Sequence, residues 1–237
     1  MRKTLSIIAA STLLAIGLGN TALADEGGEK SGLFVGVHGG VSLFGVGMYD
    51  GNGKAWSDKD YKDSKMDKSA ASFNVGLKAG YQYFFMPMVG VRGYLGYDFN
   101  GSRVFTKGSV LSQLMPGAKD VNVSFQNITL NADVMVNFLN TDSFTLGAYV
   151  GFGLGYGITG VTGPKAGIDR FLGNMNYNGF NIPINVGIAA TFAGSHKVEI
   201  GAKIQALSAG YSSKTKNDKT EYLMNTHVIN VGYSYIF

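Results

Sequence analysis

The chain contains little proline, little histidine and no cysteine. Among its 237 residues, 4 are proline and 3 are histidine. The absence of cysteine excludes disulfides, thiol nucleophiles and thiolate metal sites. Scarce proline and the lack of a Gly-x-y period argue against a collagen-like or disordered chain, although glycine is abundant at 35 residues. The composition therefore favours an ordered fold in which glycine serves close packing or sharp curvature.

Long apolar runs are also missing, apart from one near the N-terminus. That run is shorter than the about 20 residues that a membrane-spanning helix needs. Its flanks are typical of a secretory signal peptide, so we predict a signal over residues 1–24 and a mature domain over 25–237. An uncleaved anchor is the alternative. The features of this segment are the basic pair Arg2 and Lys3, the apolar run 5–18, and the small residues Ala22 and Ala24 before Asp25.

An excess of one charge sign is absent as well. Two of the 20 basic residues lie in the predicted signal peptide, which leaves 18 against 16 acidic residues in the mature domain. A nearly balanced charge gives no electrostatic basis for binding nucleic acid, so no such partner is expected. The lack of cysteine fits an exported bacterial protein that does without disulfides.

Alternation of apolar and small residues is the main pattern that the chain does contain. In the last seven residues, Val231, Tyr233, Tyr235 and Phe237 alternate with smaller or more polar positions such as Gly232. A period of two places large side chains on one face of a strand. An edge strand of an ordinary sandwich would show the same local pattern, so the rest of the chain has to decide.

Eight such segments can be marked, and each is long enough for a tilted strand to cross a bilayer. They cover about residues 33–43, 73–83, 89–99, 128–138, 144–158, 180–192, 198–206 and 222–237. The connections alternate between short (84–88, 139–143 and 193–196) and long (46–71, 100–121, 159–178 and 208–221). This layout predicts an all-β fold, a transmembrane antiparallel eight-stranded up-and-down β-barrel with four long outer loops and short periplasmic turns. Near 126–127 the alternation changes parity, which predicts a bulge or the end of the membrane segment.

The distribution of large side chains favours a membrane barrel over a soluble, lipocalin-like one. The apolar face is too bulky for the inside of eight strands, whereas the opposite face is rich in Gly, Ser, Thr and Asn. Aromatic residues gather beside the short turns and predict an interfacial girdle. They are Tyr81, Tyr83, Phe84, Phe85, Phe138, Phe144, Tyr233, Tyr235 and Phe237.

With these features the chain resembles the Helicobacter-type outer-membrane proteins, and in size the OmpA/OmpX-like eight-stranded barrels. The similarity is most specific in the glycine-rich segment 147–156, in the segment 180–187 and in the terminal Val-Gly-Tyr-Ser-Tyr-Ile-Phe. The resemblance implies residence in the bacterial outer membrane. It also implies that Val231, Tyr233, Tyr235 and Phe237 act as an assembly signal for periplasmic chaperones and the barrel-assembly machinery. Outer-membrane lipids and lipopolysaccharide are the other expected partners.

Charged residues on the inward face are the candidate functional site. Three are basic and three are acidic, so they should pair inside a narrow lumen, where an unpaired charge is costly. One interpretation is a structural plug of salt bridges. The other is a narrow, gated path for ions or small solutes, opened by exchange of partners. The six residues are Lys78, Arg92, Asp98, Asp133, Glu199 and Lys203.

The sequence does not predict an enzyme, a cofactor or a metal site. His38 is expected to face the lumen beside Ser42, His196 to lie at a periplasmic turn, and His227 to lie on the lipid side near the outer rim. No serine, histidine and acid converge by spacing. Function would then rest with the long loops. The first, with five lysines and five aspartates, is either a solvated loop or a surface that binds phosphorylated lipids and divalent ions. Apolar spacing in the second and third predicts short helical turns over the barrel mouth, or a surface for an unidentified ligand.

Overall fold

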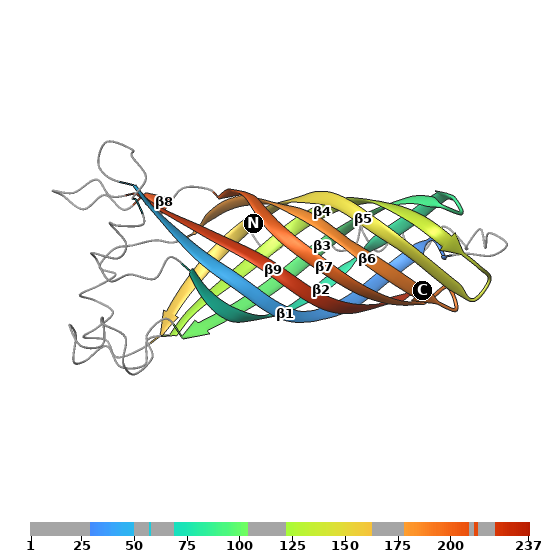
Figure 1. Cartoon of the computed structure of the whole chain (residues 1–237), viewed down its shortest axis with the longest axis horizontal. Helices are drawn as coiled ribbons and strands as arrows, with labels where there is room; N and C mark the ends of the chain where they lie inside the picture. The colour runs from blue at the N-terminus through green and yellow to red at the C-terminus, as the bar shows by residue number, and fades with distance from the viewer. Residues whose placement is uncertain are drawn as a thin grey trace, which may run out of the picture.

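The computed structural model describes residues 29–49, 57, 69–103, 122–162, 178–208, 211–212 and 221–237, and they form one antiparallel sheet closed into a barrel (Figure 1). The strands are β1 (Gly32–Tyr49), β2 (Ser69–Met86), β3 (Val89–Arg103), β4 (Asn122–Asn140), β5 (Phe144–Thr162), β6 (Gly179–Phe192), β7 (His196–Ser208), β8 (Tyr211–Ser212) and β9 (Glu221–Ile236). Among the described residues, no helix is long and apolar enough to span a membrane.

Each long strand pairs with its neighbours along the chain, and β9 pairs with β1 to close the sheet. The closing ladder runs from Phe34 opposite Ile236 to Tyr49 opposite Glu221. Eight strands are long, as predicted, and β8 is a two-residue strand that pairs with the outer part of β9. Closure leaves no strand edge unpaired toward lipid, where backbone groups would find no hydrogen-bond partner.

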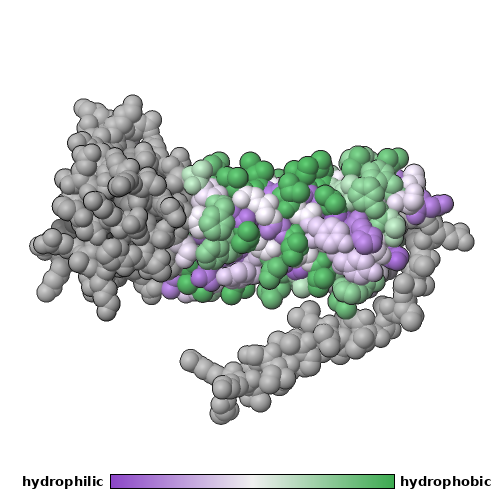
Figure 2. Space-filling model, turned by 90° about the horizontal axis from the view of Figure 1, so that it is seen from below, coloured by the Kyte–Doolittle hydropathy of each residue, from purple (hydrophilic) through white to green (hydrophobic). Residues whose placement is uncertain are grey.

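Alternation along every strand sorts the side chains as predicted. On β2, Phe73, Val75 and Leu77 are each about half exposed, while Asn74 and Gln82 are buried inside the barrel. Figure 2 shows the result on one face, where apolar residues form patches along the side of the barrel with white and purple residues between them. An exposed apolar wall around a polar interior reverses the arrangement of a soluble protein and suits a lipid environment. The one buried apolar cluster in the described interior joins Phe34, Tyr94 and Ile236.

The strands extend further than the alternating pattern predicted, and one predicted bulge is absent. β1 continues to Tyr49, and β3 to Arg103. The β3–β4 ladder runs without a shift from Val89 opposite Val136 to Arg103 opposite Asn122, so the expected bulge at 126–127 is wrong. The other expectation for these residues, the end of the membrane segment, stays a prediction. The strand itself keeps its alternation. The parity of the sequence pattern changes because an apolar residue, Phe125, lies buried on the inner face. Register shifts occur instead between Phe84 and Met86, between Asn137 and Leu139, and between Ile182 and Pro183.

Aromatic residues mark both ends of the apolar wall. At the short-turn end Tyr83, Phe85 and Phe237 are exposed on the outer face, where the C-terminus also lies (Figure 1). Phe84 was predicted to belong to this girdle, but its ring packs over Gly90, on the inward face. At the opposite end the paired rings are those of Phe73 and Phe99, and of Tyr156 and Phe180.

The predicted signal and most of the predicted loops lie outside the described residues. Ala22, Ala24 and Asp25 therefore keep their predicted role as a cleavage site. The same holds for the ligand and helical-turn predictions on residues 50–56, 58–68, 104–121 and 163–177. The described residues are therefore mainly those of the barrel wall and its lumen.

Candidate functional site

All six charged residues predicted for the lumen point into it, from β2, β3, β4 and β7. Each of the six occupies an inward position in the alternating pattern of its strand. Glycines at other inward positions leave room for these side chains. The structure divides them between two clusters. The central cluster comprises Lys78, Arg92, Asp133 and Glu199, and the outer cluster comprises Asp98, Lys203 and His38.

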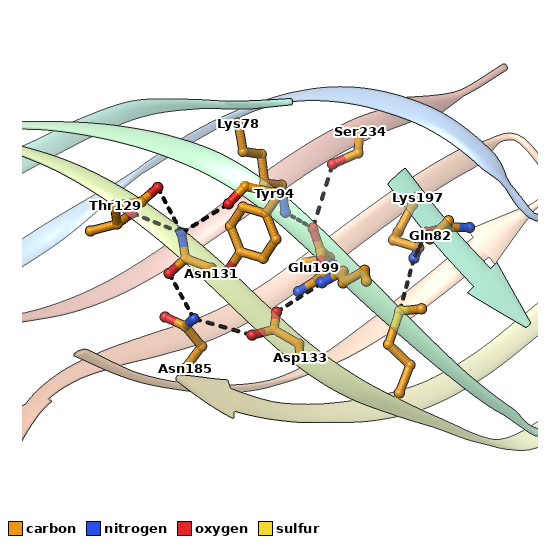
Figure 3. Close-up of polar contacts among 12 residues, drawn as sticks. Lys78, Gln82, Tyr94, Thr129, Asn131, Asp133, Asn185, Lys197, Glu199 and Ser234 are labelled. Atoms are coloured by element: carbon orange, nitrogen blue, oxygen red, sulfur yellow. Dashed lines mark hydrogen bonds and ion pairs between the residues drawn. The ribbon is translucent and has the colours of Figure 1, made fainter. Parts of the chain in front are cut away.

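The central cluster is organised around the carboxylate of Glu199. Lys78 Nζ contacts Glu199 Oε2, and Arg92 Nη1 contacts Glu199 Oε1. Arg92 Nε donates a second bond, of 2.8 Å, to Asp133 Oδ2. In Figure 3 Lys78 lies on one side of Glu199 and Asp133 on the other, and Asp133 is bonded to Arg92 and not to Glu199. Charge-assisted hydrogen bonds of this kind compensate the desolvation of buried ions only when both partners are held in place.

Aromatic rings and amides hold the central cluster. The Arg92 guanidinium carbon lies 4.3 Å from the centre of the Tyr149 ring, a cation–π geometry. Asn185 Nδ2 donates to Asp133 Oδ1 over 3.1 Å and to Asn131 Oδ1 over 3.0 Å. Asn131 Nδ2 in turn donates to Thr129 Oγ1 (Figure 3). Arg92 and Asp133 are therefore each held by neighbouring groups as well as by their ion pair.

The outer cluster is organised around Asp98. Lys203 Nζ lies 2.6 Å from Asp98 Oδ2 and 2.8 Å from Oδ1. His38 Nε2 is 2.7 Å from Asp98 Oδ1, and Asn74 Nδ2 is 3.4 Å from the same oxygen. Sequence reasoning placed His38 in the lumen but did not identify Asp98 as its partner.

A third cluster, which we call the periplasmic cluster, was not predicted. Lys197 pairs with Glu29, just before β1, and donates 2.7 Å to Gln82 Oε1. Gln82 Nε2 donates 2.9 Å to Glu29 Oε1, and Lys30 Nζ donates 3.0 Å to Ser195 Oγ. Residues 29–30 thus lie against the short-turn end of the lumen. Lys197 has the same parity as Glu199 and could have been found from it, whereas nothing in the periodicity points to Glu29.

A small cavity separates the central and outer clusters. Its volume is about 20 Å³, close to the space that one water molecule needs. It is lined by His38, Lys78, Arg92, Tyr94, Tyr149, Asn185, Ala202, Lys203 and Asn230. Apart from this cavity, the clusters occupy the middle of the barrel with charged side chains, as expected for eight strands.

The arrangement offers no hydrolytic machinery among the described residues. His38 is bound to Asp98, but Ser42 lies two inward positions further along β1, too far for a nucleophile that His38 could activate. His196 Nδ1 instead contacts Tyr233 Oη at 2.8 Å on the exposed face. No group of three or more potential metal ligands occurs in the described part of the chain.

A closed antiparallel barrel with an apolar outer wall, aromatic rims and a paired, charged interior defines an integral outer-membrane β-barrel protein. Residues 76–237 match the family model described as Helicobacter outer membrane protein. The chain belongs to this family, and its place is the outer membrane.

Solved structures of other outer-membrane barrels are similar only at a distance. Neisserial surface protein A is 13% identical, with 86% of this chain and 97% of that chain covered and a TM-score of 0.39. Ail, the attachment invasion locus protein of Yersinia pestis, is also 13% identical, with 89% and 99% covered and a TM-score of 0.34. The outer membrane enzyme PagL is 11% identical, with 83% and 99% covered and a TM-score of 0.37. No curated protein sequence matches the chain, and likenesses this weak carry no functional argument.

Proposed function

We propose that this protein is a non-enzymatic outer-membrane barrel with a closed lumen, whose work is structural and is done at its outer surface. The observation that carries the proposal is the pairing of the lumen. The central, outer and periplasmic clusters join Lys78, Arg92, Lys197 and Lys203 to carboxylates, and each of these basic groups is bound. These ion pairs join neighbouring and distant strands across the interior and so hold the barrel together.

The passage of ions through such an interior would require buried ion pairs to break. Removing one partner of a buried pair costs about 3–5 kcal/mol, because the other charge is left without compensation. Spontaneous opening by that route would be populated in fewer than about one molecule in a hundred. The lumen is thus better suited to rigidity than to transport, which leaves the outer loops available for contacts with lipids, lipopolysaccharide or an unidentified surface ligand.

Planar-bilayer recording tests the closed lumen. We expect no single-channel steps from the purified, refolded protein, because the ion pairs of the central cluster join β2, β3, β4 and β7 across the lumen. The alternative, a narrow gated channel, is favoured by the charged lining itself. Steps in the wild type that change with Lys78→Ala or Glu199→Ala would establish that alternative and refute the closed lumen. Steps unaffected by both variants would mean that the current does not pass through the central cluster.

Assembly is expected to depend on the terminal aromatic stripe. Phe237 N donates a 2.9 Å bond to Leu33 O, and its ring lies edge-on to Tyr235 at 5.1 Å. Deleting Phe237 should lower the amount of folded barrel in the outer membrane several-fold, measured by membrane fractionation and immunoblotting. Phe237→Tyr, which keeps an aromatic ring at the rim, is the matched control and should assemble normally. Wild-type levels of the deleted form would contradict the assembly signal.

A further inference from the structure

The cavity between the central and outer clusters is lined almost entirely by hydrogen-bond donors. Its charged side chains are Lys78, Arg92 and Lys203, with His38 beside them, and no carboxylate side chain lines it. Tyr94, Tyr149 and Asn230 add hydroxyl and amide groups that can donate, whereas Asn185 Nδ2 already donates to Asn131 and Asp133. From this lining we infer that the cavity binds one monatomic, monovalent anion of about the size of chloride.

The nearby carboxylates do not compete for this position. Both oxygens of Asp98 accept bonds from Lys203, and His38 also contacts Oδ1. The two oxygens of Glu199 are each contacted by a different cation, Arg92 or Lys78. An ammonium group has three N–H donors, and Lys78 donates one of them to Glu199. The remaining donors have an acceptor only if something occupies the cavity.

Asn230, on β9, provides an independent indication of a ligand. Its side chain lines the cavity, and the residue is only 8% exposed. Among the described residues, no side-chain hydrogen bond involves Asn230. Other buried side chains in the same state, such as Ser42, Asn137 and Thr191, do not line the cavity. A buried amide without a partner is costly, and a bound acceptor would satisfy its N–H groups.

Size and charge limit the choice of ligand. A volume of about 20 Å³ accommodates a water-sized or halide-sized particle. The ion pairs of the described lumen join four basic side chains to four carboxylates, so a bound anion adds one negative charge. Lys78, Arg92 and Lys203, which line the cavity, are the groups that would face this charge.

Bromide is the probe for the first test, because its anomalous scattering distinguishes it from water. Crystals of the detergent-solubilised full chain should be grown in sodium bromide. We expect an anomalous peak in the cavity, within hydrogen-bonding distance of Lys78 Nζ and the Asn230 amide. Water is the other occupant of suitable size, and Asn185 Oδ1, which lacks a donor in the structure, would accept from it. Density without an anomalous peak at molar bromide would overturn the anion site.

The second test compares two asparagine variants in solution. At equal ionic strength, sodium chloride should raise the thermal unfolding midpoint of the wild type over sodium gluconate by about 2 °C or more. Asn230→Leu fills the cavity without removing a member of any ion pair, and it should abolish this difference. Asn137→Leu makes the same change at a buried inward position that does not line the cavity, and it should retain the difference. An equal chloride effect in both variants, or none in the wild type, would refute the proposal.

Discussion

Gly40→Val is expected to prevent closure of the barrel. A Cβ on Gly40 would lie 2.0 Å from Ile229 O and 2.7 Å from Asn230 Cα, both backbone atoms of β9. Backbone cannot move aside as a side-chain end can, so the β1–β9 ladder would have to separate. We expect a loss of at least about 3 kcal/mol in the free energy of unfolding and little folded protein. The measurement is heat-modifiable mobility on cold gels, where only the closed barrel migrates as the compact form.

Gly39→Val is the matched control for this prediction. Gly39 precedes Gly40 on β1 but faces outward, and the nearest atom to an added Cβ would be Asn74 O at 3.8 Å, an ordinary contact. Valine is favoured in strands and suits a lipid-facing position. The Gly39 variant should therefore fold as the wild type does. If both variants folded equally well, or failed equally, the assignment of the inner and outer faces of β1 would be wrong.

Glu199→Ala should be the most destabilising loss of a charged side chain in the lumen. It leaves the positive charges of Lys78 and Arg92 buried, with only Asp133 remaining as a partner of Arg92. Breaking a buried pair from one side costs about 3–5 kcal/mol. Urea-induced unfolding in lipid vesicles, followed by circular dichroism, should show that loss as a lower midpoint with an unchanged slope.

Two variants control for this effect. Asp142→Ala removes a carboxylate from an exposed turn between β4 and β5, and it should change the unfolding free energy by less than about 0.5 kcal/mol. Glu199→Gln retains an acceptor oxygen without the charge and should fall between Glu199→Ala and the wild type. A destabilisation by Glu199→Ala no larger than that of Asp142→Ala would mean that the central cluster does not hold the barrel together.

The sequence predicts most of the fold because one physical rule governs it. A barrel wall between lipid and a narrow lumen requires every second residue to be large and apolar, so the strands and their inward faces can be read directly. The six charged lumen residues follow from the same rule, since a charge has only the inner face available. Balanced charge in a small space then predicts that they pair, and the structure shows the pairs.

The remaining features depend on contacts that periodicity does not encode. Glu29 precedes the first strand, and only the closed barrel brings it to Lys197, 168 positions away. His38 and Asp98 likewise meet across β2, which alternation alone does not specify. Phe125 misled the interpretation because its apolar side chain lies inside, where the pattern calls for a small or polar residue, and this produced the predicted bulge.

The length of the strands has a consequence for what meets this protein from outside the cell. β1 has 18 residues and β5 has 19. At about 3.4 Å per residue and a tilt of about 40°, these two strands rise about 45 Å, against an apolar band of about 25 Å. The aromatic rim of Tyr83, Phe85 and Phe237 fixes the short-turn end at the inner interface. The surplus height of about 20 Å therefore lies above the apolar band, at the level of the outer lipid headgroups and a little beyond them. A molecule that approached from outside would therefore meet the ends of β1 and β5 before it reached the apolar part of the bilayer.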